Sequence, residues 1–165
     1  MRTEWIPRGD IEHILAALMP ENRLVCEVCL RTGLRVGDVL KLKTAQLKQR
    51  FTIQEEKTGK TRSVYLSKGL LDKLLKTAGK IYVFPHRYSG KKHRTRQAVY
   101  KDLRRAAVLF RVDEIIAPHS LRKIYAVEAF EKFGNLERVK KLLNHSSEAV
   151  TYIYAMANHL DKRHS

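Results

Sequence analysis

"RTGLRVGD", residues 31–38, marks a point at which one helix ends and another begins. Gly33 suits the left-handed backbone conformation with which helices commonly terminate. Because Arg35 follows this stop so closely, we expect the backbone to hold its side chain in place, although one more surface arginine is the alternative interpretation. Asp38 lies three residues later, where one helical turn lets it support a neighbouring helix end or orient a basic side chain.

Apolar periodicity predicts helices on both sides of this stretch and a hairpin after it. The upstream helices cover 9–20, with Asp10 as N-cap, and 21–33, and a short helix covers 35–42. The β-hairpin covers 50–67 and turns at 58–59. The remaining predicted elements are a helix over 68–79, a short strand over 81–84, a loop, and helices over 95–110, 118–134, 135–143 and 146–160. We therefore predict one α+β domain over residues 1–165, mainly α-helical with a small antiparallel β-sheet.

The charge of the chain points to a polyanionic partner. Lysine and arginine number 33 against 17 aspartates and glutamates, which gives a net charge of +16 and a pI of about 10.1. A folded chain this basic repels itself unless a polyanion is near, and nucleic acid is the usual one. Residues 86–111 carry nine of these cations and one acid, a density that indicates a phosphate-contacting face. The alternative is a solvated basic surface.

Other patterns argue against membrane, metal and nucleotide functions. No apolar run is long enough for a membrane span, and the first ten residues lack the apolar stretch of a secretion signal. Cys26 and Cys29 lie in an apolar helical pattern, so we predict two buried free thiols rather than zinc ligands. "TGKT", residues 58–61, resembles the end of a phosphate-binding loop, but Gln54 stands where that loop needs glycine. We predict neither a metal nor a cofactor.

Two further segments hold candidate functional side chains. "HSLR" places His119 and Arg122 on one helical face, where they can grip the same anion, although this spacing is often incidental. "NHSSEAVTYIYA", residues 144–155, contains two tyrosines. Helical spacing groups Val150 with Ile153 in an apolar stripe, with Tyr154 at its edge and Tyr152 facing elsewhere. Taken alone, this pattern favours Tyr154 as an ordinary core residue.

Four segments, in order and at similar spacing, resemble the catalytic domain of the tyrosine recombinases, the phage integrase family. The resemblance runs from about residue 11 to residue 154 and rests on "RTGLRVGDVLKLKTAQL", "EEKTGKTRSVYLS", "PHSLRKIYAVEAF" and "LLNHSSEAVTYIYA". It implies a catalytic set of Arg35, Lys57, His119, Arg122, His145 and Tyr154, with Asp38 in a supporting acidic position. Lys60 is the alternative to Lys57. The nucleophilic tyrosine normally lies nine residues after the second histidine, which selects Tyr154 over Tyr152.

The resemblance also implies an activity and partners. Family members cleave DNA through a 3′-phosphotyrosine and a free 5′-hydroxyl in site-specific recombination, and the covalent intermediate makes ATP and metal unnecessary. The expected partners are double-stranded DNA, further copies in a tetramer on paired DNA sites, and accessory DNA-binding proteins, with a monomer away from DNA. The expected DNA contacts are Lys60, Arg62, Lys91, Lys92, Arg94 and Arg96.

The resemblance leaves some alternatives open. A non-catalytic DNA-binding module of the same fold and a type IB topoisomerase-like nicking-closing enzyme are the competing functions. The helical N-terminal domain that usually completes a clamp around DNA has no room in 165 residues, so we expect a catalytic-domain fragment or a minimal member. We expect a cytoplasmic, DNA-associated protein encoded by a prokaryote or a phage.

Overall fold

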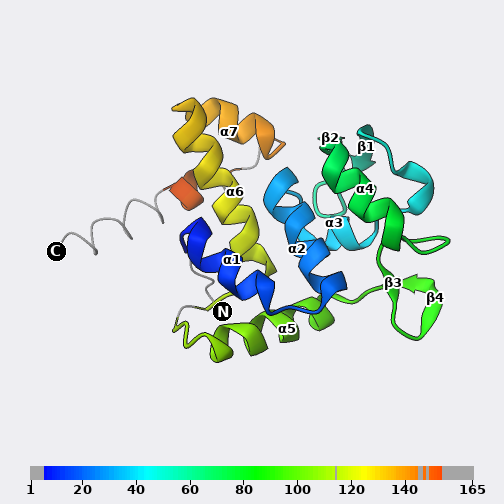
Figure 1. The fold of residues 1–165 in the computed structure, drawn as a ribbon. Helices are drawn as coiled ribbons and strands as arrows, with labels where there is room; N and C mark the ends of the chain where they lie inside the picture. The colour runs from blue at the N-terminus through cyan, green and yellow to red at the C-terminus, as the bar shows by residue number, and fades with distance from the viewer. Residues whose placement is uncertain (1–5, 114, 145–146, 148, 154–165) are drawn as a thin grey trace.

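Helices form most of the computed structural model, which describes residues 6–113, 115–144, 147 and 149–153 (Figure 1). Two small antiparallel sheets accompany them, one of strands β1 and β2 and the other of β3 and β4. The predicted mainly helical α+β class is confirmed. In chain order the elements are α1 (Arg8–Ala16), α2 (Pro20–Thr32), α3 (Val36–Leu40), the 3-10 turn η1 (Thr44–Gln46), β1 (Arg50–Gln54), β2 (Thr61–Tyr65), α4 (Lys68–Thr77), β3 (Pro85–His86), β4 (Ser89–His93), α5 (Arg96–Leu109), α6 (Pro118–Phe133) and α7 (Leu136–Leu142).

Helix α2 lies at the centre, with α6 and α7 on one side and both hairpins on the other (Figure 1). It contacts α1, α3, α5 and α6, and its buried residues accordingly face several directions. Val25, Val28 and Cys29 are buried as predicted, whereas Leu24 is only partly buried. Gly33 has a φ of 69° and ends the helix in the left-handed conformation that the sequence predicts.

The first hairpin follows the predicted alternating pattern, and this pattern buries a charged residue, Arg62. Strands β1 and β2 pair antiparallel, with Phe51 opposite Val64 and Ile53 opposite Arg62. Alternate side chains of a strand point to opposite faces, so the burial of Val64 places Arg62 on the inward face as well. Gly59 has a φ of 68° in the connection between the strands.

A second apolar cluster joins α6 and α7 to the helical residues 149–153. Here the predicted stripe is wrong, because Ala149 and Tyr152 are buried while Val150 and Ile153 are only partly buried. A tyrosine can enter a core when its hydroxyl finds a partner, and its ring then supplies a large apolar surface. The members of this α6–α7 cluster are Ala126, Ala129, Val139, Leu143, Ala149 and Tyr152.

Two smaller predictions are also corrected. The strand predicted over 81–84 is reduced to a single bridge between Tyr82 and Lys43, and the second hairpin forms in the following segment, where a loop is predicted. Val83 and Phe84 are apolar because they enter the core, not because they pair along a sheet. Helix α1 begins after Pro7 and not at Asp10, whose charge instead lies in the first turn.

None of the helices in the described ranges is both long and apolar enough to cross a membrane.

The two cysteines are buried free thiols, as predicted. Burial, opposed by the positive charge of Arg122, raises the pKa of Cys29 to about 12, and burial also raises the pKa of Cys26 well above its ordinary value. Because the thiolate is the reactive form, we expect iodoacetamide at pH 8 to leave both cysteines unmodified in the native protein. Mass spectrometry should then find two alkylated cysteines after denaturation in urea. Rapid modification under native conditions would contradict this burial.

Candidate functional site

A cavity of about 570 Å³ lies where four parts of the chain meet. The start of α3, the β1–β2 connection and the first turns of α5 and α6 supply its walls. Four of the six residues that the resemblance implies as catalytic line it, namely Arg35, Lys57, His119 and Arg122. The other two, His145 and Tyr154, lie outside the described residues. Arg96, one of the predicted DNA contacts, also lines this cavity.

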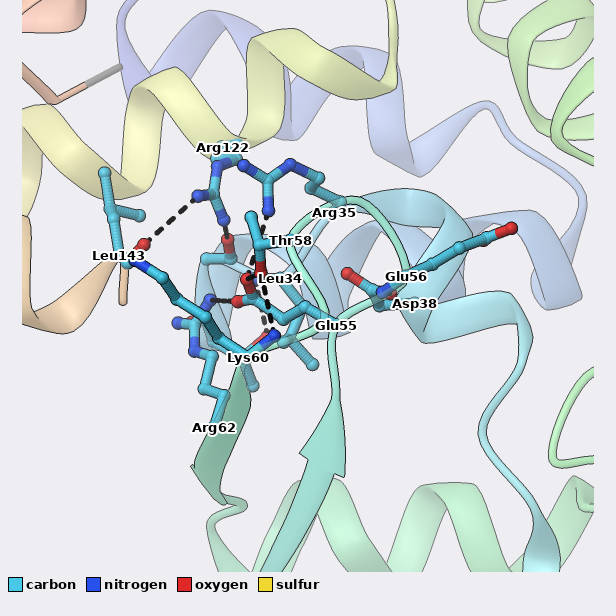
Figure 2. A network of polar contacts seen from close by, with 12 residues as sticks. Leu34, Arg35, Asp38, Glu55, Glu56, Thr58, Lys60, Arg62, Arg122 and Leu143 are labelled. Carbon is cyan, nitrogen blue, oxygen red and sulfur yellow. Dashed lines mark hydrogen bonds and ion pairs between the residues drawn. The ribbon is translucent and has the colours of Figure 1, made fainter. Parts of the chain in front are cut away.

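The C-terminal end of α2 holds two buried guanidinium groups. Arg122 is 1% exposed and donates from Nη1 to the carbonyl oxygen of Gly33, while Arg62 donates from Nη2 to that of Thr32. Arg122 also donates from Nη2 to the carbonyl oxygen of Leu143 at 3.5 Å (Figure 2). The last carbonyls of a helix lack intrahelical partners and carry the negative end of its dipole. This helix end therefore suits both cations.

Gly33 is required at this helix end for two reasons. Its φ of 69° is one that other residues adopt at a cost. A Cβ at this position would also lie 2.3 Å from Cδ1 of Tyr125, which packs over the glycine from α6. Any side chain here would displace either the ring or the carbonyl group that Arg122 binds.

A buried carboxylate links the first hairpin to the start of α3. Glu55 is 1% exposed, and its Oε2 accepts from Arg35 Nη1 at 3.3 Å and from Thr58 Oγ1 at 3.0 Å (Figure 2). Its Oε1 accepts from Arg62 Nη1 at 3.5 Å. Burial, followed by the nearby charge of Arg122, lowers the pKa of Arg62, and the Glu55 charge opposes that shift. Glu55 thus positions Arg35 and offsets the charge of an interior arginine.

Asp38 fixes the hairpin through its backbone. The carboxylate is buried, and its Oδ1 accepts from the backbone N–H of Glu56 at 3.0 Å. From the sequence we expect Asp38 to support a helix end or to orient a basic side chain, whereas this contact is with the backbone of the strand connection. The hydrogen bond fixes the residue before Lys57. The start of α3 therefore both supplies Arg35 and holds the strand connection that carries Lys57.

Helix α6 presents the predicted His-x-x-Arg pair to the cavity. Pro118 occupies the first turn, as predicted, and His119 is exposed just after it, with Arg122 buried one turn later. The Nε2 atom of His119 lies 3.0 Å from the hydroxyl of Tyr152, and the two rings meet edge to face with centroids 5.4 Å apart. The sequence spacing gave no indication of this contact, because Tyr152 was expected to face elsewhere.

The predicted DNA contacts fall into two groups. Lys60, Lys91, Lys92 and Arg96 are exposed. Arg62 is 8% exposed, and Arg94 is partly buried and donates from Nη1 to Asn22 Oδ1 at 3.1 Å. Their surroundings favour structural roles over the predicted DNA contacts. The inward position of Arg62 could have been inferred from its alternation with Val64, and that of Glu55 from its alternation with Phe51 and Ile53.

Among the residues that the structure describes, no group of three histidine, cysteine, aspartate or glutamate side chains is placed to hold a metal ion. The predicted independence from metal and cofactor stays a prediction.

Comparison with known proteins relates this arrangement to one family. The profile described as "Phage integrase family" matches residues 4–161. The integrase of Escherichia phage P2 is 27% identical over 154 residues, a match that covers 93% of this chain and 43% of that protein. The chain therefore spans less than half the length of this curated relative.

Solved structures show the same fold. A lambda integrase dimer bound to a COC′ core site superposes with a TM-score of 0.77 at 20% identity, over 93% of this chain and 48% of that one. The catalytic domain of bacteriophage HP1 integrase superposes with a TM-score of 0.66 at 22% identity, over 97% of this chain and 92% of that domain. At these identities the likeness establishes the fold of a recombinase catalytic domain.

The buried ion pairs make a testable contribution to stability. We expect Glu55→Gln to lower the free energy of unfolding by about 3 kcal/mol, because Arg62 then stays in the interior without a counter-charge. Urea denaturation measures the loss. Glu56→Gln removes the adjacent exposed carboxylate and its ion pair with Lys41, and should change stability far less, because that pair is exposed to solvent. The double variant Glu55→Gln/Arg62→Met should recover part of the loss, and a Glu55→Gln protein as stable as the parent would contradict the role of this contact.

Proposed function

Because the chain belongs to the phage integrase family, we propose that it cleaves and rejoins DNA strands through a 3′-phosphotyrosine intermediate in site-specific recombination. The observation that carries this proposal is the convergence of Arg35, Lys57, His119 and Arg122 on one cavity. These residues come from distant parts of the sequence and offer only cationic or hydrogen-bonding groups to a ligand. A phosphodiester is the part of DNA that such a set suits best.

The two arginines supply electrostatic stabilisation. Phosphoryl transfer places charge on the nonbridging oxygens, and donors fixed in advance stabilise that charge without reorganising. Arg122 is fixed by the carbonyl group of Gly33, and Arg35 is fixed by the carboxylate of Glu55. Each guanidinium has five N–H donors, so these protein contacts leave donors for a phosphate.

The proton transfers assign the remaining roles. The Tyr154 oxygen forms a bond to phosphorus while the bond from phosphorus to the 5′-oxygen breaks. A phenol with an ordinary pKa of about 10 must lose its proton in this step, and His119 is the group in the cavity suited to accept it. Lys57 gives the leaving 5′-oxygen its proton. His145 donates a further hydrogen bond to the phosphate, and a 5′-hydroxyl from either strand then reverses the attack.

The wider assembly is proposed on the family resemblance. Exposed Lys60, Lys91, Lys92 and Arg96 contact the DNA backbone around the cavity, and Asp38 supports the hairpin. Copies of the chain assemble as a tetramer on paired DNA sites and separate to monomers away from DNA. Accessory DNA-binding proteins are further partners, and neither a metal nor ATP takes part.

The nucleophile is tested with a nicked suicide substrate that carries candidate DNA ends. The parent protein should form a covalent adduct on a denaturing gel, and peptide mapping should place it on Tyr154. Tyr154→Phe should bind the same DNA with unchanged affinity and form no adduct, because it lacks the attacking oxygen. Tyr65→Phe alters an exposed tyrosine outside the cavity lining and serves as the matched control, with adducts at the parental level.

Adducts that persist in Tyr154→Phe would refute this assignment. Absence of adducts in the parent, with DNA binding retained, would indicate a binding module. Adducts without strand exchange between two duplexes would indicate a topoisomerase-like enzyme.

The proposed acid is tested separately. Lys57→Ala should slow cleavage by roughly 10²- to 10⁴-fold, the usual contribution of a positioned acid. A substrate with sulfur at the bridging 5′ position should restore the rate, because a thiolate leaves without a proton. Lys60→Ala on the same hairpin is the matched control: loss of its proposed contact with the DNA backbone should weaken binding, while cleavage of both substrates at saturating DNA stays near the parental rate. Equal loss on the oxygen and sulfur substrates would argue against the acid role.

A further inference from the structure

We propose that Tyr152 is a positioning residue for His119. Through this contact, the packing of residues 149–153 on α6 determines how the His119 ring is oriented in the cavity. The inference rests on the proposed function, in which the imidazole of His119 accepts the proton of the attacking phenol. Nothing in the family resemblance gives Tyr152 a role, since the spacing from His145 selects Tyr154 as the nucleophile.

The phenol of Tyr152 is held from two directions. Its side chain is 2% exposed and belongs to the α6–α7 cluster with Val139 and Leu143. Its hydroxyl lies 3.0 Å from Nε2 of His119, and the ammonium of Lys123 lies 6.0 Å from its ring centroid. A buried hydroxyl without a partner is costly, so the contact with His119 is what permits this tyrosine in the core.

His119 gains a defined orientation from the same contact. It is exposed on the first turn of α6, where an imidazole can rotate and can carry its proton on either ring nitrogen. For Nδ1 to accept the proton of the attacking phenol, Nε2 must carry its hydrogen and donate it to the Tyr152 hydroxyl, so this contact fixes both the ring plane and the tautomer. The edge-to-face packing of the two rings, with centroids 5.4 Å apart, restricts the rotation further.

The placement of Tyr152 fits positioning and not attack. An attacking phenol must reach a phosphate in the cavity, and Tyr152 is not among the described residues that line it. Its ring is enclosed by the α6–α7 cluster. In the sequence it lies two residues before Tyr154. Docking of residues 149–153 on α6 therefore orients His119.

Tyr152→Phe tests the proposal, because it keeps the ring and removes only the hydroxyl. At saturating suicide substrate the rate of adduct formation should fall roughly three- to tenfold, the usual worth of one hydrogen bond, with the Kd for DNA unchanged. The nitrogen-15 resonances of the His119 ring, assigned by comparison with His119→Gln, should shift in the DNA-free protein. Para-aminophenylalanine at position 152 restores a polar group on the same ring and should recover part of the rate, because its amino nitrogen is a weaker acceptor than the hydroxyl.

Val139→Ala is the matched packing control. It removes volume from the same cluster and should lower the Tm, while the His119 resonances and the adduct rate at saturating DNA stay parental. A Tyr152→Phe protein with parental His119 resonances and parental rate would overturn the proposal. Peptide mapping of the adduct to Tyr152 would overturn it too. If the parent forms no adduct on any substrate, the proposed function fails, and the His119 resonances still decide whether Tyr152 positions that ring.

Discussion

The carbonyl groups at the C-terminal end of α2 are the contacts on which the cavity depends. Thr32 and Gly33 offer them to Arg62 and Arg122, one from the first hairpin and the other from α6. The left-handed turn at Gly33 ends the helix, frees these oxygens and starts the chain toward Arg35. One helix terminus therefore supplies the acceptor that Arg122 binds and also determines where Arg35 lies.

Burying this much charge is energetically unfavourable unless every group is paired. A buried ion pair often contributes less stability than an apolar replacement would, so the contact of Glu55 with Arg35 and Arg62 is better explained by placement than by strength. The carboxylate belongs to the same strand connection as Lys57, and its partners belong to two other parts of the fold. The interior ion pairs give a small, mainly helical domain a rigid charged wall on one side of its cavity.

The sequence was most informative where structure is local. The helix stop at Gly33, the alternating strands around Gly59 and the helix start at Pro118 all follow from backbone preference and short-range periodicity. The contacts of Glu55 and Tyr152 do not, because each joins residues distant in the sequence, and the same side chains occur on surfaces. The second hairpin was missed because the apolar residues Val83 and Phe84 enter the core before it, which imitates a strand.

The long-range contacts of Arg122 determine when the cavity can form during synthesis of the chain. Its guanidinium binds a carbonyl group at the end of α2 and another at Leu143, after α7, and it lines a cavity that also needs Lys57 from the first hairpin. A chain still emerging from the ribosome lacks the later of these segments and cannot form the complete cavity. The cavity therefore takes its described form only after α6 has been synthesised, and the last of the described contacts of Arg122 forms once Leu143 has followed.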